Sequence, residues 1–114
     1  MDVEKIFDSE VREENGWVIW STIGKLDVNT SRDAGKIGVE VLKSGNKIIL
    51  NMSRTTYLSS AGIRMILRLA QQAEDDDKTF TVCAPQERVM EVLELSGMAE
   101  LLDIYDTVEE VIKN

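Results

Sequence analysis

Two adjacent serines, Ser59 and Ser60, have the sequence setting in which a hydroxyl group could do chemistry. Residues 47–52 before them are apolar and β-branched enough for a buried strand. Apolar residues after them recur at the spacing of one helical face, namely Ile63, Ile66, Leu67 and Ala70. The first amides of a helix lack partners, so a serine there can cap the helix or, once phosphorylated, present its phosphate to them. We therefore predict a strand–helix junction whose function depends on these serines.

The amino-acid composition narrows the possible functions. The chain has 114 residues, 43% of them hydrophobic and 30% charged, which suits one domain with a single core. A formal net charge of −8 argues against nucleic acid or an anionic membrane as the partner and favours a basic or neutral protein. No apolar run is long enough to span a bilayer, and the acidic N-terminus differs from a signal peptide. We expect a cytoplasmic protein without membrane insertion.

Histidine is absent from the sequence, which removes the usual general base and the commonest zinc ligand. We therefore predict no catalytic residues, no metal and no cofactor. The acidic run at residues 74–78 lacks the alternating ligands and the glycine of a calcium loop, so we interpret it as a solvated loop. Cys83 is the only cysteine, so it forms no internal disulfide, and its apolar neighbours indicate a buried thiol.

Turn residues and hydrophobic periodicity predict a hairpin at the start of the chain. Residues 5–12 and 17–23 are typical of strands, and the Asn-Gly dipeptide between them favours a tight turn. Trp17 and Trp20 lie three apart in the second strand, so we expect them on opposite faces, one inward and one outward.

A first helix is expected after this hairpin. Thr30 and Asp33 have the spacing of a capping box, which predicts a start near Thr30, and residues 44–46 stop the pattern. Its predicted inner face carries Ala34, Ile37, Gly38 and Val41.

In the second half of the chain, predicted strands continue to alternate with predicted helices. Strands are predicted at residues 79–83 and 104–105, and the helix between them is expected to hold Pro85 in its first turn. A second capping box at residues 107–110 begins a last short helix. The order ββαβαβαβα predicts an α/β protein with a mixed central sheet of about five strands and about four helices.

Four segments together resemble the STAS domain of bacterial anti-sigma factor antagonists: GKLD at 24–27, ILNMS at 49–53, YLSSAGI at 57–63 and VLELSGM at 92–98. The resemblance covers nearly the whole length, and the junction is a fairly specific part of it. It implies the STAS fold and a single STAS domain over residues 1–114.

The resemblance also implies a function. In such proteins the junction serine is phosphorylated by an anti-sigma factor that is also an ATP-dependent serine kinase. A metal-dependent serine phosphatase removes the phosphate again. The unphosphorylated form binds the anti-sigma factor and frees sigma. By position the acceptor is Ser60, two residues before Gly62, while many members carry aspartate where this chain has Ser59. Asp27 matches an acidic residue near the partner surface, and Ala61 stands where others have a second hydroxyl.

Further candidates for partner binding follow on the predicted helix. Arg64 and Arg68 lie away from its buried stripe, and Met65 and Leu69 flank that stripe as a candidate exposed apolar patch. The complete candidate set for partner binding is Asp27, Ser59, Ser60, Ala61, Gly62, Arg64, Met65 and Arg68.

Structural interpretations compete with the functional ones. Ser59 could act only as a helix cap, Asp27 could cap the loop before the first helix, and Gly62 could serve to bring helix and sheet close. The alternative function is a constitutive STAS scaffold, or a ligand-binding subunit of a transporter or signalling assembly. An independent enzyme is disfavoured, since no nucleophile–base pair or phosphate-binding glycine loop is present. We expect a monomer that forms hetero-complexes.

Overall fold

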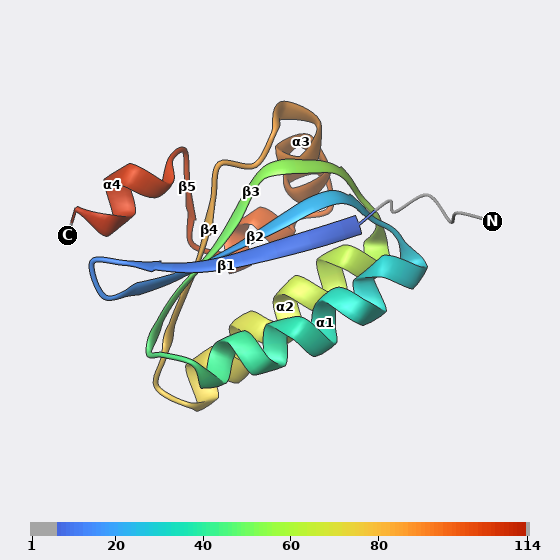
Figure 1. The fold of residues 1–114 in the computed structure, drawn as a ribbon. Helices are drawn as coiled ribbons and strands as arrows, with labels where there is room; N and C mark the ends of the chain where they lie inside the picture. Colours follow the sequence, from blue (N-terminus) through green and yellow to red (C-terminus); the bar gives the residue numbers. More distant parts are fainter. Residues whose placement is uncertain (1–6, 114) are drawn as a thin grey trace.

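The computed structural model describes residues 7–113 as one mixed sheet with helices on both faces (Figure 1). The strands are β1 (Phe7–Glu14), β2 (Trp17–Leu26), β3 (Lys47–Leu58), β4 (Thr79–Cys83) and β5 (Ile104–Tyr105). The helices are α1 (Val28–Lys43), α2 (Ser60–Asp75), α3 (Glu87–Leu95) and α4 (Val108–Ile112), with a 3₁₀ helix at Met98–Leu101. The predicted class and element order are confirmed.

The strands lie in the sheet in their order along the chain. β1 and β2 form the predicted antiparallel hairpin, whose turn residues Asn15 and Gly16 both have positive φ, as the tight turn requires. The pairs β2–β3, β3–β4 and β4–β5 are parallel. Parallel strands end at the same edge of a sheet, and Leu26 pairs with Leu58 there. The loop after β2 and the loop after β3 are therefore neighbours.

Two hydrophobic clusters lie on the two faces of the sheet. The larger lies beneath α1 and α2, which run side by side in Figure 1, and α3 contributes to it. The smaller is closed by α4 on the opposite face. Trp20 belongs to the first cluster and Trp17 to the second, so the prediction of opposite faces is confirmed. The expectation that one of them points outward is wrong, because α4 buries Trp17 as well.

Several predicted boundaries differ from the structure. β3 continues to Leu58, well beyond residue 52, because its polar second half still pairs with β2 across register shifts. α2 ends at Asp75 and so contains part of the acidic run, and α3 begins at Glu87, which leaves Pro85 before the helix. Residues 5–6 of the predicted first strand lie outside the described residues.

The start of α1 is also different. The helix begins at Val28, and its cap is Asp27. The capping box joins Asp27 to Thr30 and does not join Thr30 to Asp33. The Thr30 hydroxyl donates to the carbonyl oxygen of Lys25 at 2.6 Å, so the end of β2 already holds this side chain. That tie fixes the start of the helix earlier than the sequence pattern indicates.

Candidate functional site

Ser59 stands at the junction between β3 and α2 and is the cap of α2. Its backbone is extended, and its Oγ accepts a hydrogen bond from the backbone N–H of Gly62 at 3.2 Å. The hydroxyl donates in turn to the carbonyl oxygen of Leu26 at 2.8 Å, and the Ser59 backbone N–H donates to the same oxygen at 2.9 Å. The structural interpretation of Ser59 as a cap is confirmed, and its hydroxyl is fully engaged.

Ser60, the next residue, is the first residue of α2 and is exposed. Within residues 7–113 no group forms a hydrogen bond with its side chain. Ser60 belongs to the first turn of α2, where the partial positive charge of the backbone amides favours an anion. This turn carries no acidic residue. The two serines therefore differ in kind: one is bound into the fold and the other is available to a partner.

Asp27 caps the neighbouring helix α1. Its Oδ1 accepts hydrogen bonds from the backbone N–H groups of Asn29 and Thr30, both at 2.9 Å, while its own backbone N–H donates to Thr30 Oγ1 at 2.9 Å. The backbone hydrogen bond from Thr30 is the main cause that lowers the pKa of Asp27, and the side chain of Thr30 and the Asn29 amide add to it. The structural interpretation of Asp27 as a cap is confirmed, and the carboxylate is held charged.

Gly62 brings the junction and the sheet into close contact. A Cβ at this position would lie 2.6 Å from Cδ1 of Leu58 and 3.0 Å from the carbonyl oxygen of Leu26. These distances are shorter than ordinary van der Waals contact, so a larger residue would require the Leu58 side chain to move and the Leu26 carbonyl to give way slightly. The predicted structural role of Gly62 is confirmed.

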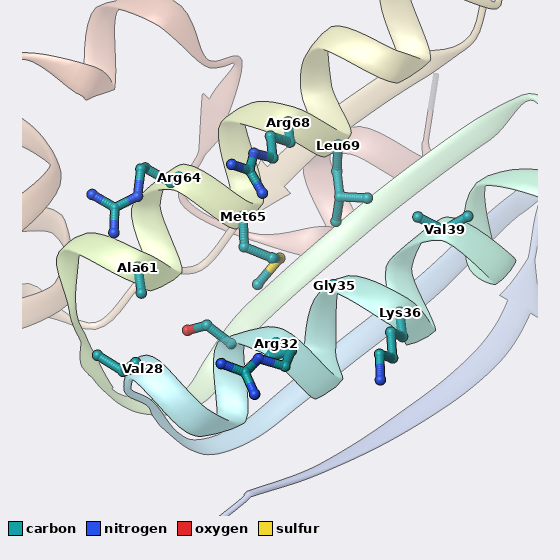
Figure 2. A pocket seen from close by; sticks show the side chains of 11 residues that line it. Val28, Arg32, Gly35, Lys36, Val39, Ala61, Arg64, Met65, Arg68 and Leu69 are labelled. Carbon is teal, nitrogen blue, oxygen red and sulfur yellow. The ribbon is translucent and has the colours of Figure 1, made fainter.

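A hollow of about 480 Å³ lies between α1 and α2 and adjoins the junction through Ala61. Figure 2 shows Arg32 and Lys36 on α1 and Arg64 and Arg68 on α2. We call it the α1–α2 groove, and its lining consists of Val28, Ser31, Arg32, Gly35, Lys36, Val39, Ala61, Arg64, Met65, Arg68 and Leu69. The candidates Ala61, Arg64, Met65 and Arg68 thus lie together in one surface feature. The contribution of α1 to this feature was not predicted.

The predicted exposure of Met65 and Leu69 is wrong, since they are only 7% and 3% exposed. The reason is the close packing of α1 beside α2. A Cβ on Gly38 would lie 2.5 Å from Cδ1 of Leu69, and one on Gly35 would lie 3.3 Å from Cγ of Met65. The glycines let α1 approach and cover a second face of α2. Leu67, predicted as buried, is only half-buried.

Cys83 lies in the smaller cluster, on the face of the sheet that α4 covers. Burial raises the pKa of its thiol to about 12, and the nearby carboxylates of Glu110 and Glu109 contribute to the rise. A thiol with this pKa is protonated at neutral pH and is a poor nucleophile. The prediction of a buried cysteine is confirmed.

Comparison with known proteins identifies the fold. The family model of the STAS domain matches residues 8–111. The chain belongs to the STAS family. A relative from Bordetella bronchiseptica, provisionally named as the anti-sigma factor antagonist BtrV, is 27% identical over 81 residues, which are 71% of this chain and 70% of the relative.

Solved structures of other STAS proteins superpose closely on this one. An anti-sigma factor antagonist from Mycobacterium paratuberculosis reaches a TM-score of 0.85 at 18% identity, over 94% of this chain and 92% of the other. The Bacillus cell fate determinant SpoIIAA in its phosphorylated form reaches 0.69 at 20% identity, over 94% and 96%. At these identities the likeness shows a shared fold. Among the described residues of this STAS chain, no helix has the length and apolar character needed to cross a membrane.

Proposed function

We propose that this protein is an anti-sigma factor antagonist that acts in the cytoplasm and is switched by phosphorylation of Ser60. In its unphosphorylated form it binds an anti-sigma factor that is also a serine kinase, and sigma is released. Phosphorylation blocks this binding, and a metal-dependent serine phosphatase reverses it. The observation that carries the proposal is the contrast between Ser60, exposed and unbonded among residues 7–113, and Ser59, bound twice to Leu26.

The local structure tolerates a phosphate on Ser60. A phosphoserine adds about −1.5 to −2 charges at pH 7. At the start of a helix an anion is stabilised by about 0.3 to 1 kcal/mol, and α2 has no acidic residue in its first turn to oppose it. Because the Ser59 cap is a separate residue, modification of Ser60 leaves the hydrogen bonds of the junction intact. The fold should therefore survive the modification.

Phosphorylation of Ser60 should disrupt binding to a partner whose surface covers this residue, although it leaves the fold intact. Such a partner must remove water from the phosphate or meet it with its own groups, and like charges brought together in an interface cost several kcal/mol. Since each 1.4 kcal/mol changes an affinity about tenfold, binding should fall by orders of magnitude. The relatives named as anti-sigma factor antagonists, and a phosphorylated neighbour of the same fold, support this assignment.

The test is phosphorylation by the anti-sigma factor kinase encoded in the same genome. The wild type, Ser60→Ala and the matched neighbour variant Ser59→Ala are incubated with this kinase and ATP, and the site is located by mass spectrometry. We expect phosphate on the wild type and on Ser59→Ala, and none on Ser60→Ala. A phosphate on Ser59, or a Ser60→Asp variant that binds the anti-sigma factor as tightly as the wild type, would overturn the proposal and favour a constitutive binding module.

A further inference from the structure

The α1–α2 groove has the opposite charge to the rest of the molecule. Its lining holds four of the chain's 13 lysines and arginines, and none of its 21 aspartates and glutamates, in the part of the chain that the structure describes. The four cations are Arg32, Lys36, Arg64 and Arg68, and none of them forms an ion pair with another residue of the 7–113 range. This acidic protein thus carries a cluster of positive charge in one hollow, with no ion-pair partner among residues 7–113.

The cations are arranged in two rows with an apolar floor between them. Arg32 and Lys36 are one helical turn apart on α1, and Arg64 and Arg68 are one turn apart on α2. Figure 2 shows Met65 between the two helices. This arrangement complements a helix whose apolar stripe is flanked by acidic residues on both sides.

The groove is also long enough for such a helix. On α1 its lining extends from Val28 to Val39, which corresponds to about 16 Å of helix at 1.5 Å per residue. These two valines are 64% and 45% exposed, so apolar surface remains open to solvent at the rim. A docked helix of about three turns would cover both of them.

A second observation points to a missing occupant. The side chain of Ser31 lines the groove and is only 4% exposed, and its Oγ has no hydrogen-bond partner among the described residues. A buried hydroxyl without a partner is unfavourable, so native proteins usually satisfy such groups. A rotation of the Ser31 side chain would expose this oxygen to a bound segment, whose polar groups could then provide the missing hydrogen bond.

We propose that the α1–α2 groove binds an acidic, amphipathic helical segment of the partner protein. A small anion with one charged head could neutralise one or two cations, whereas acids along both sides of a helix can meet all four. The identification of that partner as the anti-sigma factor rests on the proposed function. The local charge of the groove also modifies the expectation of a basic or neutral partner, because the segment that enters the groove must be acidic.

The groove and the phosphorylation site belong to one surface. Ser60 and Arg64 are four residues apart on α2 and are therefore neighbours on its face. A phosphate on Ser60 would stand at the end of the groove, pair with Arg64 and repel the acids of the bound helix. Docking in the groove and phosphorylation of Ser60 should therefore exclude each other.

The test compares two charge-matched variants. Arg32→Glu with Arg68→Glu reverses two cations of the groove, and Arg88→Glu with Lys113→Glu makes the same change in net charge at exposed cations outside it. Affinity is measured by calorimetry for the purified anti-sigma factor. A synthetic 16-residue helix, with a leucine stripe flanked by glutamates, is the second probe, and its glutamine counterpart is the control. Circular dichroism verifies that each variant is folded.

We expect the groove variant to bind both probes roughly 10- to 100-fold more weakly than the wild type, and the control variant to bind nearly as well as the wild type. The glutamine peptide should bind neither the wild type nor either of the two variants. Equal binding by the two variants would overturn the inference. It would also be overturned if the wild type bound neither the anti-sigma factor nor the acidic peptide. If the groove variant loses binding but Ser60 is never phosphorylated, the proposed switch fails while the groove inference stands. If Ser60 is phosphorylated and the groove variant binds as well as the wild type, the groove inference fails while the proposed switch stands.

Discussion

Ser59 donates two hydrogen bonds to the carbonyl oxygen of Leu26, one from its backbone N–H at 2.9 Å and one from its hydroxyl at 2.8 Å. The oxygen has two lone pairs and can accept both. These bonds join the end of β2 to the start of α2, although the two residues lie on different elements. They also turn the Ser59 side chain inward, so that Ser60 is the serine presented to solvent.

Removal of the Ser59 hydroxyl should destabilise the junction. Ser59→Ala loses the cap on the Gly62 amide and one of the bonds to Leu26, and loss of a serine cap costs about 1 kcal/mol. We expect urea denaturation to show a lower free energy of unfolding by about that amount or more. Ser60→Ala is the matched control, because an exposed substitution changes stability by about 0.5 kcal/mol or less. Equal destabilisation by the two substitutions would contradict this account.

Two glycines on neighbouring helices should respond oppositely to a methyl group. In Gly62→Ala the new Cβ meets Leu58 and the backbone oxygen of Leu26, so we expect a loss of about 1 to 3 kcal/mol. In Gly35→Ala the nearest atom is Cγ of the flexible Met65 side chain at 3.3 Å, and alanine favours a helix by about 0.5 to 1 kcal/mol. Thermal unfolding should therefore show a lower Tm for the first variant and a similar or higher Tm for the second.

The Asp27 cap should make stability depend on pH in the acid range. Its pKa is lower in the folded state than in the unfolded chain, so the native state binds fewer protons there and stability rises with pH. The contribution is complete above the unfolded pKa of about 4 and is lost as the pH falls through the folded pKa. We expect Asp27→Asn to show a shallower loss of stability below about pH 4, measured by urea denaturation at several pH values. Identical slopes for both proteins would exclude this role.

Cys83 should be unreactive while the protein is folded. Its pKa of about 12 and its burial leave almost no thiolate at pH 8. A thiol-specific reagent such as DTNB should therefore react slowly with the native protein and rapidly in guanidinium chloride, where the pKa returns to about 8.5. Equally fast reaction in both conditions would show that the thiol is accessible in the folded state.

The local features of the junction could be predicted from sequence, and the tertiary ones could not. The positions of Ser59 and Gly62 follow from the apolar run before them and the helical pattern after them. The α1–α2 groove instead depends on residues more than twenty positions apart, such as Lys36 and Arg64. They line one groove because parallel pairing of β2 with β3 places the two following helices side by side. Periodicity within one helix carries no information about this contact.

The predicted exposure of Met65 is wrong because it, too, depends on a tertiary contact. A helix that packs only on a sheet buries one stripe, and the apolar pattern of α2 by itself predicts only that stripe. Because Gly35 and Gly38 have no side chains, α1 packs closely against Met65 and Leu69 of α2. The two glycines are the sequence signal for a close helix contact. The sequence does not indicate which surface packs against them, because that depends on the tertiary fold.

Phosphorylation of Ser60 should leave the fold intact and stabilise it slightly. The phosphate joins the N-terminus of α2, which favours an anion by about 0.3 to 1 kcal/mol, and it can pair with Arg64 one turn away. We therefore expect the phosphorylated protein to unfold at an equal or higher temperature than the unmodified one in calorimetry. Arg64→Gln should reduce this difference and Arg68→Gln, two turns from the phosphate, should not. If phosphorylation instead lowered the Tm in all three proteins, loss of partner binding would have to be attributed to damage at the junction and not to charge on an intact surface.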